Sequence, residues 1–171
     1  MARGACGVCQ GRAVRLAELV PATDERVAAR LLAVQRSARA VEAALIGNDR
    51  IPPLHEDVAA LRAAPLEWLG AFMDDRLAGA VAVRDAGDGL DIDRLVVAPP
   101  AHRRGVGSVL VRAVVNRASS RRITVSTGCD NTPARTLHER LGFDHVGDEE
   151  VLLGLWVAHH LRAGGNEEAG A

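Results

Sequence analysis

The stretch Asp91-Ile-Asp-Arg-Leu-Val-Val-Ala-Pro-Pro-Ala-His-Arg-Arg-Gly-Val-Gly-Ser108 carries the strongest structural signal in the chain. Its apolar first half predicts a strand that ends at Val97, its two prolines predict a loop, and its glycines predict a helix that begins at Gly105. Glycine lets the backbone approach a ligand closely because it has no Cβ. The first amides of a helix lack intrahelical acceptors, and the helix dipole favours negative charge there. The stretch therefore predicts a phosphate or pyrophosphate cradle, with Arg103 and Arg104 as cationic donors beside it.

The charge distribution supports an anion site in the same region. The segment Leu95–Cys129 contains six arginines and no acidic residue, whereas the other residues contain 15 arginines and 22 acidic residues. All 21 basic residues are arginine, so Schiff-base chemistry on lysine is excluded. A solvated basic helix face would give the same pattern, so the charges indicate an anion site only in combination with the cradle.

Hydrophobic periodicity and turn residues predict the elements on either side of the cradle. A helix capped by Thr23 or Asp24 is expected, with a pattern that could break once before Gly47, and a helix capped by Thr132 is expected to end before Gly142. Further helices are expected at 55–64 and 105–118, and strands at 13–20, 67–73, 77–84, 90–97, 122–126, 143–146 and 151–158. This order predicts the α/β (α+β) class, with a mixed sheet covered by helices on both faces.

One domain is expected over residues 13–162, because the chain has 171 residues and neither an internal repeat nor a linker interrupts this part. Residues 1–12 and 163–171 are predicted to be a disordered stub and tail. The three cysteines, Cys6, Cys9 and Cys129, predict no disulfide framework. Cys6 and Cys9 have zinc-like spacing, but no second pair of ligands follows, so no metal site is expected.

Three known phosphate-binding motifs are candidates for the glycine-rich loop. A P-loop requires a lysine after its second glycine, and this chain has none. A dinucleotide-binding fingerprint would need a small residue at Leu110, and it usually opens a domain instead of following three antiparallel strands.

The third candidate fits better. The residues His102-Arg103-Arg104-Gly105-Val106-Gly107 resemble the acyl-CoA-binding motif of the GNAT superfamily of N-acetyltransferases, Arg/Gln-x-x-Gly-x-Gly/Ala, with His at its first position. Downstream, Asp130–Arg135 and Leu137–Phe143 resemble the superfamily's second signature, which has an Asn, a short helix and a Leu-Gly-Phe turn. This resemblance covers residues 13–161. It implies a mostly antiparallel sheet of about seven strands, of which the fourth and fifth splay apart to admit the pantetheine arm of acetyl-CoA.

The resemblance also implies roles for individual residues. The backbone of Leu95, Val96 and Val97 would hydrogen-bond the pantetheine, and Asn131 would contact the cofactor from the next helix. The pyrophosphate would lie on the loop, whose expected contacts are His102, Arg103, Arg104, Gly105, Val106, Gly107 and Ser108.

Catalysis would need proton transfer beside the thioester. Relatives commonly place a tyrosine general acid in the helix after the Asn, and the residue at the matching position here is His138. Because the chain contains no tyrosine, His138 is the candidate general acid. Asp93 and Asp91 are candidate bases, and strand alternation places both on one face. Cys129 has no His and acid beside it in sequence, so no acyl-enzyme is expected.

The sequence thus predicts an acetyl-CoA-dependent N-acetyltransferase that acts directly on a primary amine of a small molecule or a protein. A non-catalytic acyl-CoA sensor is the alternative, and a structural partner domain is a third class. Such folds select their substrates near Ile51–Glu56, and no motif in this segment identifies the acceptor.

Composition excludes other function classes. The net charge of −1 and an aromatic content of 2% argue against nucleic-acid binding. The longest apolar stretch of the second half, Val151–Ala158, is too short to span a bilayer, and without a secretory signal a cytoplasmic location is expected. That stretch could form the edge of a homodimer. Trp68 and Trp156 are expected in the core, and His159 and His160 at the surface or an interface.

Overall fold

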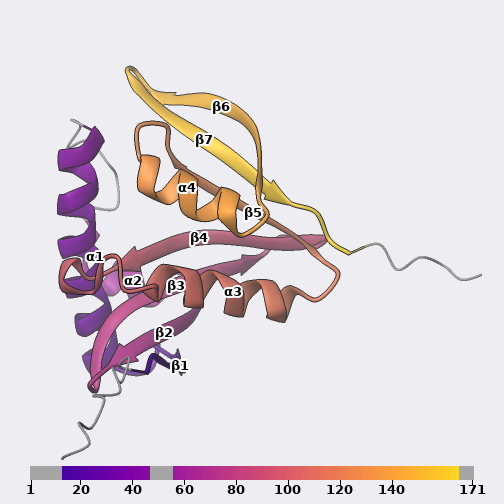
Figure 1. Ribbon diagram of the computed structural model, residues 1–171. Helices are drawn as coiled ribbons and strands as arrows, with labels where there is room; N and C mark the ends of the chain where they lie inside the picture. The colour runs from indigo at the N-terminus through magenta and orange to yellow at the C-terminus, as the bar shows by residue number, and fades with distance from the viewer. Residues whose placement is uncertain (1–12, 47–55, 166–171) are drawn as a thin grey trace, which may run out of the picture.

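A computed structural model describes residues 13–46 and 56–165 of the chain. Seven strands form one sheet in the order β1-β2-β3-β4-β5-β7-β6, and only the β4–β5 pair is parallel (Figure 1). The strands are β1 (Arg15–Leu19), β2 (Glu67–Met73), β3 (Arg76–Asp85), β4 (Gly89–Val97), β5 (Arg122–Gly128), β6 (Asp144–Leu152) and β7 (Leu155–Arg162). The helices are α1 (Glu25–Ile46), α2 (Val58–Ala63), η2 (Pro99–Ala101), α3 (Val106–Ala118) and α4 (Thr132–Arg140). The predicted fold class is confirmed.

Local sequence explains where several elements begin. Asp24 caps α1, because its carboxylate accepts from the amides of Arg26 and Val27 at 2.9 and 3.2 Å. Asp74 and Asp75 form the β2–β3 turn, with φ of 50° and 59°, values that suit a tight hairpin. The helix α1 runs without a break to Ile46, so the interruption considered for it does not occur.

Two hydrophobic cores lie on opposite faces of the sheet. Along β3, Val81 and Val83 pack against α3, whereas Ala80 and Ala82 pack against α1 and α2. The prediction of helices on both faces is therefore confirmed.

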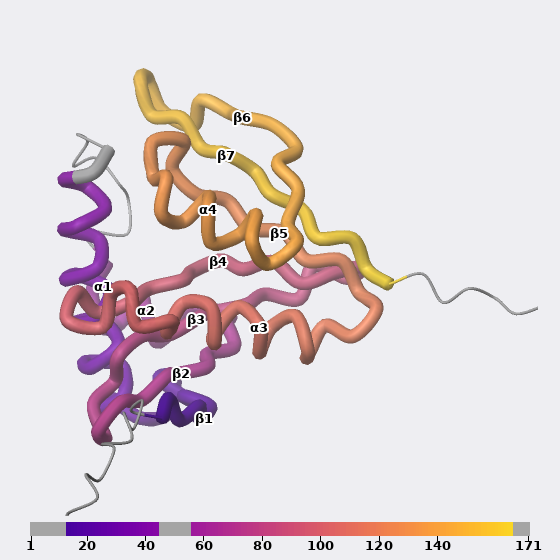
Figure 2. Tube along the Cα trace, viewed as in Figure 1, coloured from indigo at the N-terminus to yellow at the C-terminus, as the bar shows by residue number. Residues whose placement is uncertain are grey.

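The strands β4 and β5 separate halfway along their length (Figure 2). They pair only where Gly89–Ile92 face Arg122–Val125, after which β4 continues against β3 and β5 against β7. A bulge marks this point in β4, because Ala82 pairs with Arg94 and Val83 with Ile92, which leaves Asp93 without a partner. The splay that the resemblance implied is present.

The C-terminal strands differ from the prediction. The turn at Leu153 and Gly154, where Gly154 has a φ of 78°, divides β6 from β7, so the segment predicted as one strand from Val151 to Ala158 belongs to two. The edge strands of the sheet are β1 and β6, so only Val151 and Leu152 of the predicted segment belong to an edge strand, and the rest of it lies in or before β7, between β5 and β6. The predicted disordered ends lie outside the described residues, apart from 163–165, as do Cys6 and Cys9.

Four burial predictions can be compared with the structure, and His159 is partly exposed, at 36% of its side chain, as expected. Trp68 is buried as expected. Trp156 is 49% exposed, which contradicts the prediction, because it lies close to the turn of the β6–β7 hairpin and pairs with exposed Glu150 at the sheet edge. His160 is 1% exposed, also against expectation, because α4 packs over this part of β7 and carries His138 to within 5.8 Å of its ring.

Candidate functional site

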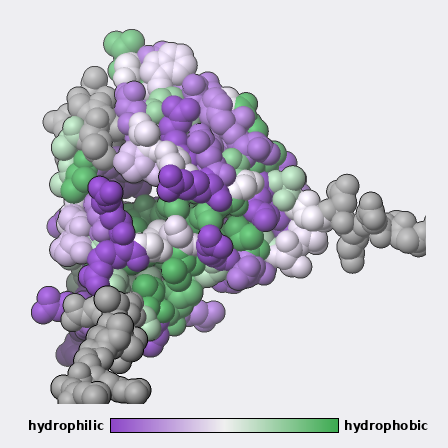
Figure 3. All heavy atoms as spheres, viewed as in Figure 1, coloured by the Kyte–Doolittle hydropathy of each residue, from purple (hydrophilic) through white to green (hydrophobic). Residues whose placement is uncertain are grey.

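A cavity of about 920 Å³ opens where β4 and β5 diverge. Its wall is formed by α1, the second half of β4, the loop before α3, the first turn of α3, the end of β5 and α4. On the face drawn in Figure 3, a hollow lies beside α1, with hydrophobic residues in its depth and hydrophilic ones at its rim. The volume is in the range of sites that bind small organic ligands.

Most of the predicted site residues meet at this cavity. Its wall includes Leu95, Val96, Val97, His102, Arg103, Gly105, Val106, Gly107, Ser108, Asn131, Asp93 and His138. Two predicted residues do not belong to the wall: Arg104, which is exposed, and Asp91.

The cradle at the start of α3 depends on its glycines. Gly105 is the residue before the helix and has a φ of 79°, a left-handed conformation that favours glycine, and a Cβ there would meet no atom within 4 Å. At Gly107 a Cβ would lie 3.1 Å from Leu137 Cδ2 of α4, so glycine allows the two helices to approach. The first backbone hydrogen bond of this turn runs from Val109 to Gly105, which leaves the amides of the intervening residues without helical acceptors.

The side chain of His102 turns back onto β4. Its Nε2 lies 2.9 Å from the carbonyl oxygen of Val97, so the histidine ties the loop to the end of the strand. This bond requires the proton on Nε2. The residue at the first position of the loop motif thus stabilises the loop itself.

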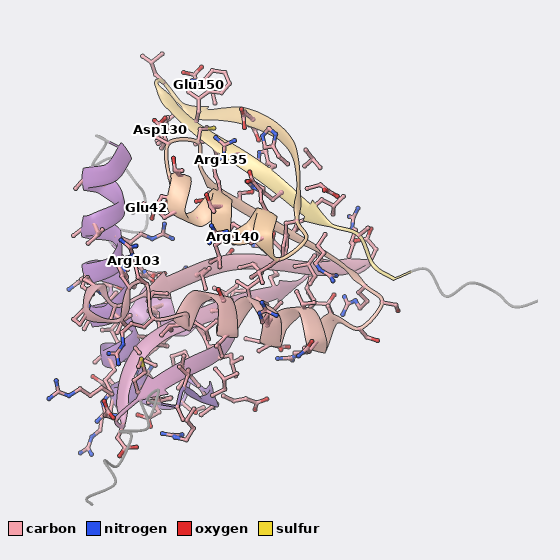
Figure 4. All side chains as sticks on the ribbon, viewed as in Figure 1. Glu42, Arg103, Asp130, Arg135, Arg140 and Glu150 are labelled. Atoms are coloured by element: carbon pink, nitrogen blue, oxygen red, sulfur yellow. The ribbon has the colours of Figure 1, made fainter. Side chains whose placement is uncertain are left out.

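Asn131 joins α4 to α1 across the mouth of the cavity. It is the N-cap of α4, where Thr132 was expected, because its Oδ1 accepts from the amide of Ala134 at 3.2 Å. Its Nδ2 donates to Glu42 Oε1 at 3.1 Å, and Arg39 donates to the other oxygen of Glu42 at 2.6 Å. Figure 4 places Glu42 and Arg103 where α1 faces the site, with Arg140 on the neighbouring α4.

Sequence reasoning missed several residues of this wall, among them Arg39, Glu42, Arg112 and Arg140. Arg112 belongs to the basic segment, and a closer reading of that segment could have found it. Arg39 and Glu42 form an ion pair three residues apart on a helix, and nothing local indicates that this face of the helix meets the start of α4.

His138 is almost completely buried in α4, with a ring 5.6 Å from that of Phe143 and 5.8 Å from that of His160. Burial, with a smaller contribution from the charge of His160, lowers the pKa of His138 from 6.5 to about 4. The ring is therefore neutral at pH 7, and it can give a proton to a leaving group only after it has received one.

The two aspartates of β4 occupy different environments. Asp91 lies where β4 and β5 still pair, and it accepts from Thr124 Oγ1 at 2.8 Å and from Arg84 at 2.9 Å. Asp93, at the bulge, reaches the cavity and forms ion pairs with Arg84 at 3.2 Å and Arg94 at 3.1 Å. Their shared contact with Arg84 places both carboxylates on one face, as alternation predicts, but only Asp93 faces the cavity.

A buried polar network supports the bulge. Arg94 pairs with Glu56, whose carboxylate also accepts from Gln35 Nε2 of α1 at 2.7 Å, and Arg94 donates to Gln35 Oε1 at 3.2 Å. The side chains of Arg94 and Glu56 are 13% and 11% exposed. The network connects β4 to α1 and to the start of α2 immediately beside Asp93.

Cys129 lies outside this cavity, in the wall of a smaller one of about 220 Å³ with Asp130, Asp148 and Trp156. Burial, and next the hydrogen bond to Asp148, raise the pKa of its thiol. The thiol form is the poorer nucleophile, so Cys129 is a poor candidate for an acyl-enzyme.

Residues 13–46 and 56–165 contain no group of three His, Cys, Asp or Glu side chains arranged to hold a metal ion. In the same ranges, no helix is long and apolar enough to cross a membrane.

Comparison with curated proteins gives relatives of similar sequence. The chain is 31% identical over 142 residues to UPF0157 protein YqkA of Bacillus subtilis (strain 168), a match that covers 82% of this chain and 41% of that protein. It is 32% identical over 137 residues to mycothiol acetyltransferase of Clavibacter sepedonicus, covering 78% and 42%. The chain therefore spans about two fifths of the length of these relatives.

Comparison with solved structures identifies the same fold. Ribosomal-protein-S18-alanine N-acetyltransferase from Escherichia coli superposes with a TM-score of 0.70 and 12% identity, over 93% of this chain and 99% of that one. PaiA N-acetyltransferase from Thermoplasma acidophilum, in complex with coenzyme A, gives 0.68 and 14%, over 88% and 99%. The sequence model of the acetyltransferase (GNAT) family matches residues 29–143. On this match, and with the splayed sheet and glycine cradle described above, the chain belongs to the acetyltransferase (GNAT) family.

Proposed function

We propose that the chain is an N-acetyltransferase that binds acetyl-CoA in the large cavity and transfers the acetyl group directly to a primary amine. The observation that best supports the proposal is that one continuous cavity contains all parts of the site. The glycine-opened start of α3 leads without interruption into the gap between β4 and β5, where Asp93 and His138 face the same space.

The residues of the cavity fit acetyl-CoA. Beyond Ile92, β4 pairs with no other described strand on its β5 side, so the backbone of Leu95–Val97 presents an unpaired strand edge to an extended chain with amide groups, such as pantetheine. The open space at Gly105 and the amides of the first turn of α3 suit a pyrophosphate, and Arg103 lies beside them. Arg104, outside the wall, would act through its charge at longer range.

When bound, acetyl-CoA supplies a thioester carbonyl that a neutral amine can attack. Asp93, held between Arg84 and Arg94, would accept a proton from the incoming ammonium, directly or through water. His138 would take the second proton from the amine nitrogen and deliver it to the departing thiolate, because burial keeps its ring neutral until then. Positioning by the cavity would supply much of the remaining rate enhancement.

The acceptor is a primary amine of a small molecule or a protein. One structural neighbour is named for an alanine of ribosomal protein S18, and one sequence relative is named as a mycothiol acetyltransferase. We retain both acceptor classes in the proposal. A location in the cytoplasm and a homodimer remain predictions.

The test combines binding and turnover. Acetyl-CoA should raise the Tm of the protein by several degrees, since a ligand at 100 times its Kd stabilises the folded state by about 2.7 kcal/mol. Gly107→Glu should abolish this shift, because it adds bulk and negative charge at the phosphate cradle, whereas Asn116→Glu, on an exposed position of the same helix, should leave it intact. Release of free CoA thiol with a panel of amines then reports transfer. A Tm shift without turnover on any amine would favour the acyl-CoA sensor instead.

A further inference from the structure

Exposed apolar side chains gather on the β6–β7 hairpin. Six large hydrophobic residues are exposed in the parts of the chain that the structure describes, and five of them belong to this hairpin: Val146, Val151, Leu152, Leu153 and Trp156. Leu153, in the turn, is 85% exposed, whereas the sixth residue, Val20, follows β1 at the opposite edge of the sheet. Figure 3 shows hydrophobic surface at the top of the view, where the hairpin ends in Figure 1. Single exposed apolar residues are common on proteins, but a group of them marks an interaction site.

Carboxylates surround this group. Four of them lie on the hairpin or in the loop before α4: Asp130, Asp148, Glu149 and Glu150. Two of the four pair with histidines, and within residues 13–46 and 56–165 no arginine forms an ion pair with any of them. Arginine ion pairs are found elsewhere, at Glu42, Glu56, Glu67, Asp75, Asp85, Asp88, Asp91 and Asp93. We call these four carboxylates, together with Val151, Leu152, Leu153 and Trp156, the hairpin surface; it is negatively charged at pH 7.

The small cavity of about 220 Å³ lies within the hairpin surface. Asp130, Asp148 and Trp156 line it, and Figure 4 shows Asp130 at the same end of the molecule as Glu150. Carboxylates and an aromatic ring together attract a guanidinium or ammonium group. Arg135 donates to the carbonyl oxygen of Cys129 at 3.0 Å, and its single charge balances only one of the two carboxylates that line the cavity. The cavity therefore suits one cationic side chain.

The hairpin surface adjoins the large cavity. Gly128, Cys129 and Asp130 line the small cavity, whereas the residues on either side of them, Thr127 and Asn131, line the large one. A segment seated on the hairpin surface would therefore run beside the proposed site of acetyl transfer. Among the described strands, β6 pairs only with β7, so its outer edge offers amides and carbonyls to an extended segment.

The charge of the hairpin surface decides between three possible occupants. A second copy of the chain, in a symmetric contact, would place four carboxylates against four, and like charges across an interface are costly. The phosphates of an anionic lipid surface would be repelled in the same way. A protein segment that combines arginine or lysine with apolar side chains matches both the negative charge and the exposed apolar area.

We propose that the hairpin surface binds a basic and apolar segment of a protein acceptor, whose amine then enters the large cavity. One cationic side chain of that segment occupies the small cavity beside Asp130 and Trp156, and its apolar side chains cover Leu153 and the neighbouring residues of the turn. The acceptor is then a protein and not a small molecule. The inference rests on the proposed acetyltransferase function and adds the class of acceptor to it.

The test uses the full chain and labelled synthetic peptides that contain a single amine. In the basic peptide arginine and leucine alternate after an N-terminal alanine, and in the acidic peptide glutamate replaces arginine; arginine supplies positive charge without adding a second amine. A second pair carries the amine on an internal lysine behind an acetylated N-terminus. The basic peptides should bind about tenfold more tightly than the acidic ones in dilute buffer, and about 0.5 M salt should reduce this preference. Release of CoA thiol should show a lower KM for the basic peptides.

Variants locate the binding surface. Asp130→Arg and Trp156→Ala change exposed side chains, so both should fold, keep the Kd of acetyl-CoA and bind the basic peptides about tenfold more weakly or worse. Two matched controls should bind these peptides as the wild type does. Asp144→Arg makes the same charge change at the start of β6, and Val20→Ala removes an exposed apolar side chain at the opposite edge of the sheet.

Equal affinity for basic and acidic peptides, or equal weakening in the control variants, would overturn the inference. A dimer in size-exclusion chromatography that Leu153→Ser dissociates would also overturn it, because a second copy would then cover the surface. Turnover of small amines by a wild type that shows no preference among the peptides refutes the docking surface alone. Binding of the basic peptides without transfer to any amine refutes the acetyltransferase function, and with it the role of the hairpin surface as an acceptor site.

Discussion

Lowering the pH from 7 to 5 should destabilise the folded chain, and His138 should account for much of the loss. The unfolded chain takes up a proton on this histidine near its ordinary pKa of 6.5, whereas the folded chain resists protonation until about pH 4. The unfolded state therefore binds more protons in the window between these values, and the free energy of unfolding decreases as the pH falls through it. From these two pKa values, the free energy of unfolding is lower than at pH 7 by about 2 kcal/mol at pH 5 and by about 3 kcal/mol below pH 4.

The measurement is urea unfolding followed by circular dichroism at pH 7.5, 6 and 5, for the wild type and for His138→Leu. Leucine is apolar and suits a site that is 2% exposed, so the variant should fold and should lose about 2 kcal/mol less than the wild type between pH 7.5 and pH 5. His160, whose pKa is lowered in the same direction, should leave the variant with part of the slope. Equal losses in both proteins would refute the assignment of a neutral, buried His138.

Three further substitutions test the site's construction. Gly107→Ala places a Cβ 3.1 Å from Leu137 Cδ2 and should cost about 1 kcal/mol of stability; an unchanged free energy of unfolding in urea would contradict this. Arg94→Met leaves the buried carboxylate of Glu56 without its ion-pair partner and should lower the free energy of unfolding in urea by about 3 kcal/mol. A decrease below about 1 kcal/mol would mean that water already reaches the pair. Asn131→Ala removes the cap of α4 and should cost about 1 kcal/mol, measured as a lower Tm, while Asn131→Ser, which keeps a capping oxygen without adding a charge beside Glu42, should recover most of it.

Local sequence was enough to predict the cradle and the order of elements. Gly105 needs a left-handed backbone, the apolar residues of α3 recur at helical spacing, and the strand before them ends at the prolines, so everything that shapes the loop lies within about 20 residues of chain. Interactions this close in sequence need no knowledge of the rest of the fold. The same reasoning failed at the β6–β7 turn, where Gly154 lies within an apolar run that reads as one strand.

The chemistry at the cavity depends on residues that are distant in sequence. Asn131 meets Glu42 across 89 positions, and Glu56 meets Arg94 across 38. The bulge in β4 brings Asp93, and not Asp91, to the cavity, because it is set by pairing with β3. Sequence alone thus determined that a glycine-opened loop precedes α3 and which family's motifs surround it. Tertiary structure alone decided that His138 is neutral, since a pKa depends on the solvent and charge around a group, and here α4, Phe143 and His160 of β7 provide both.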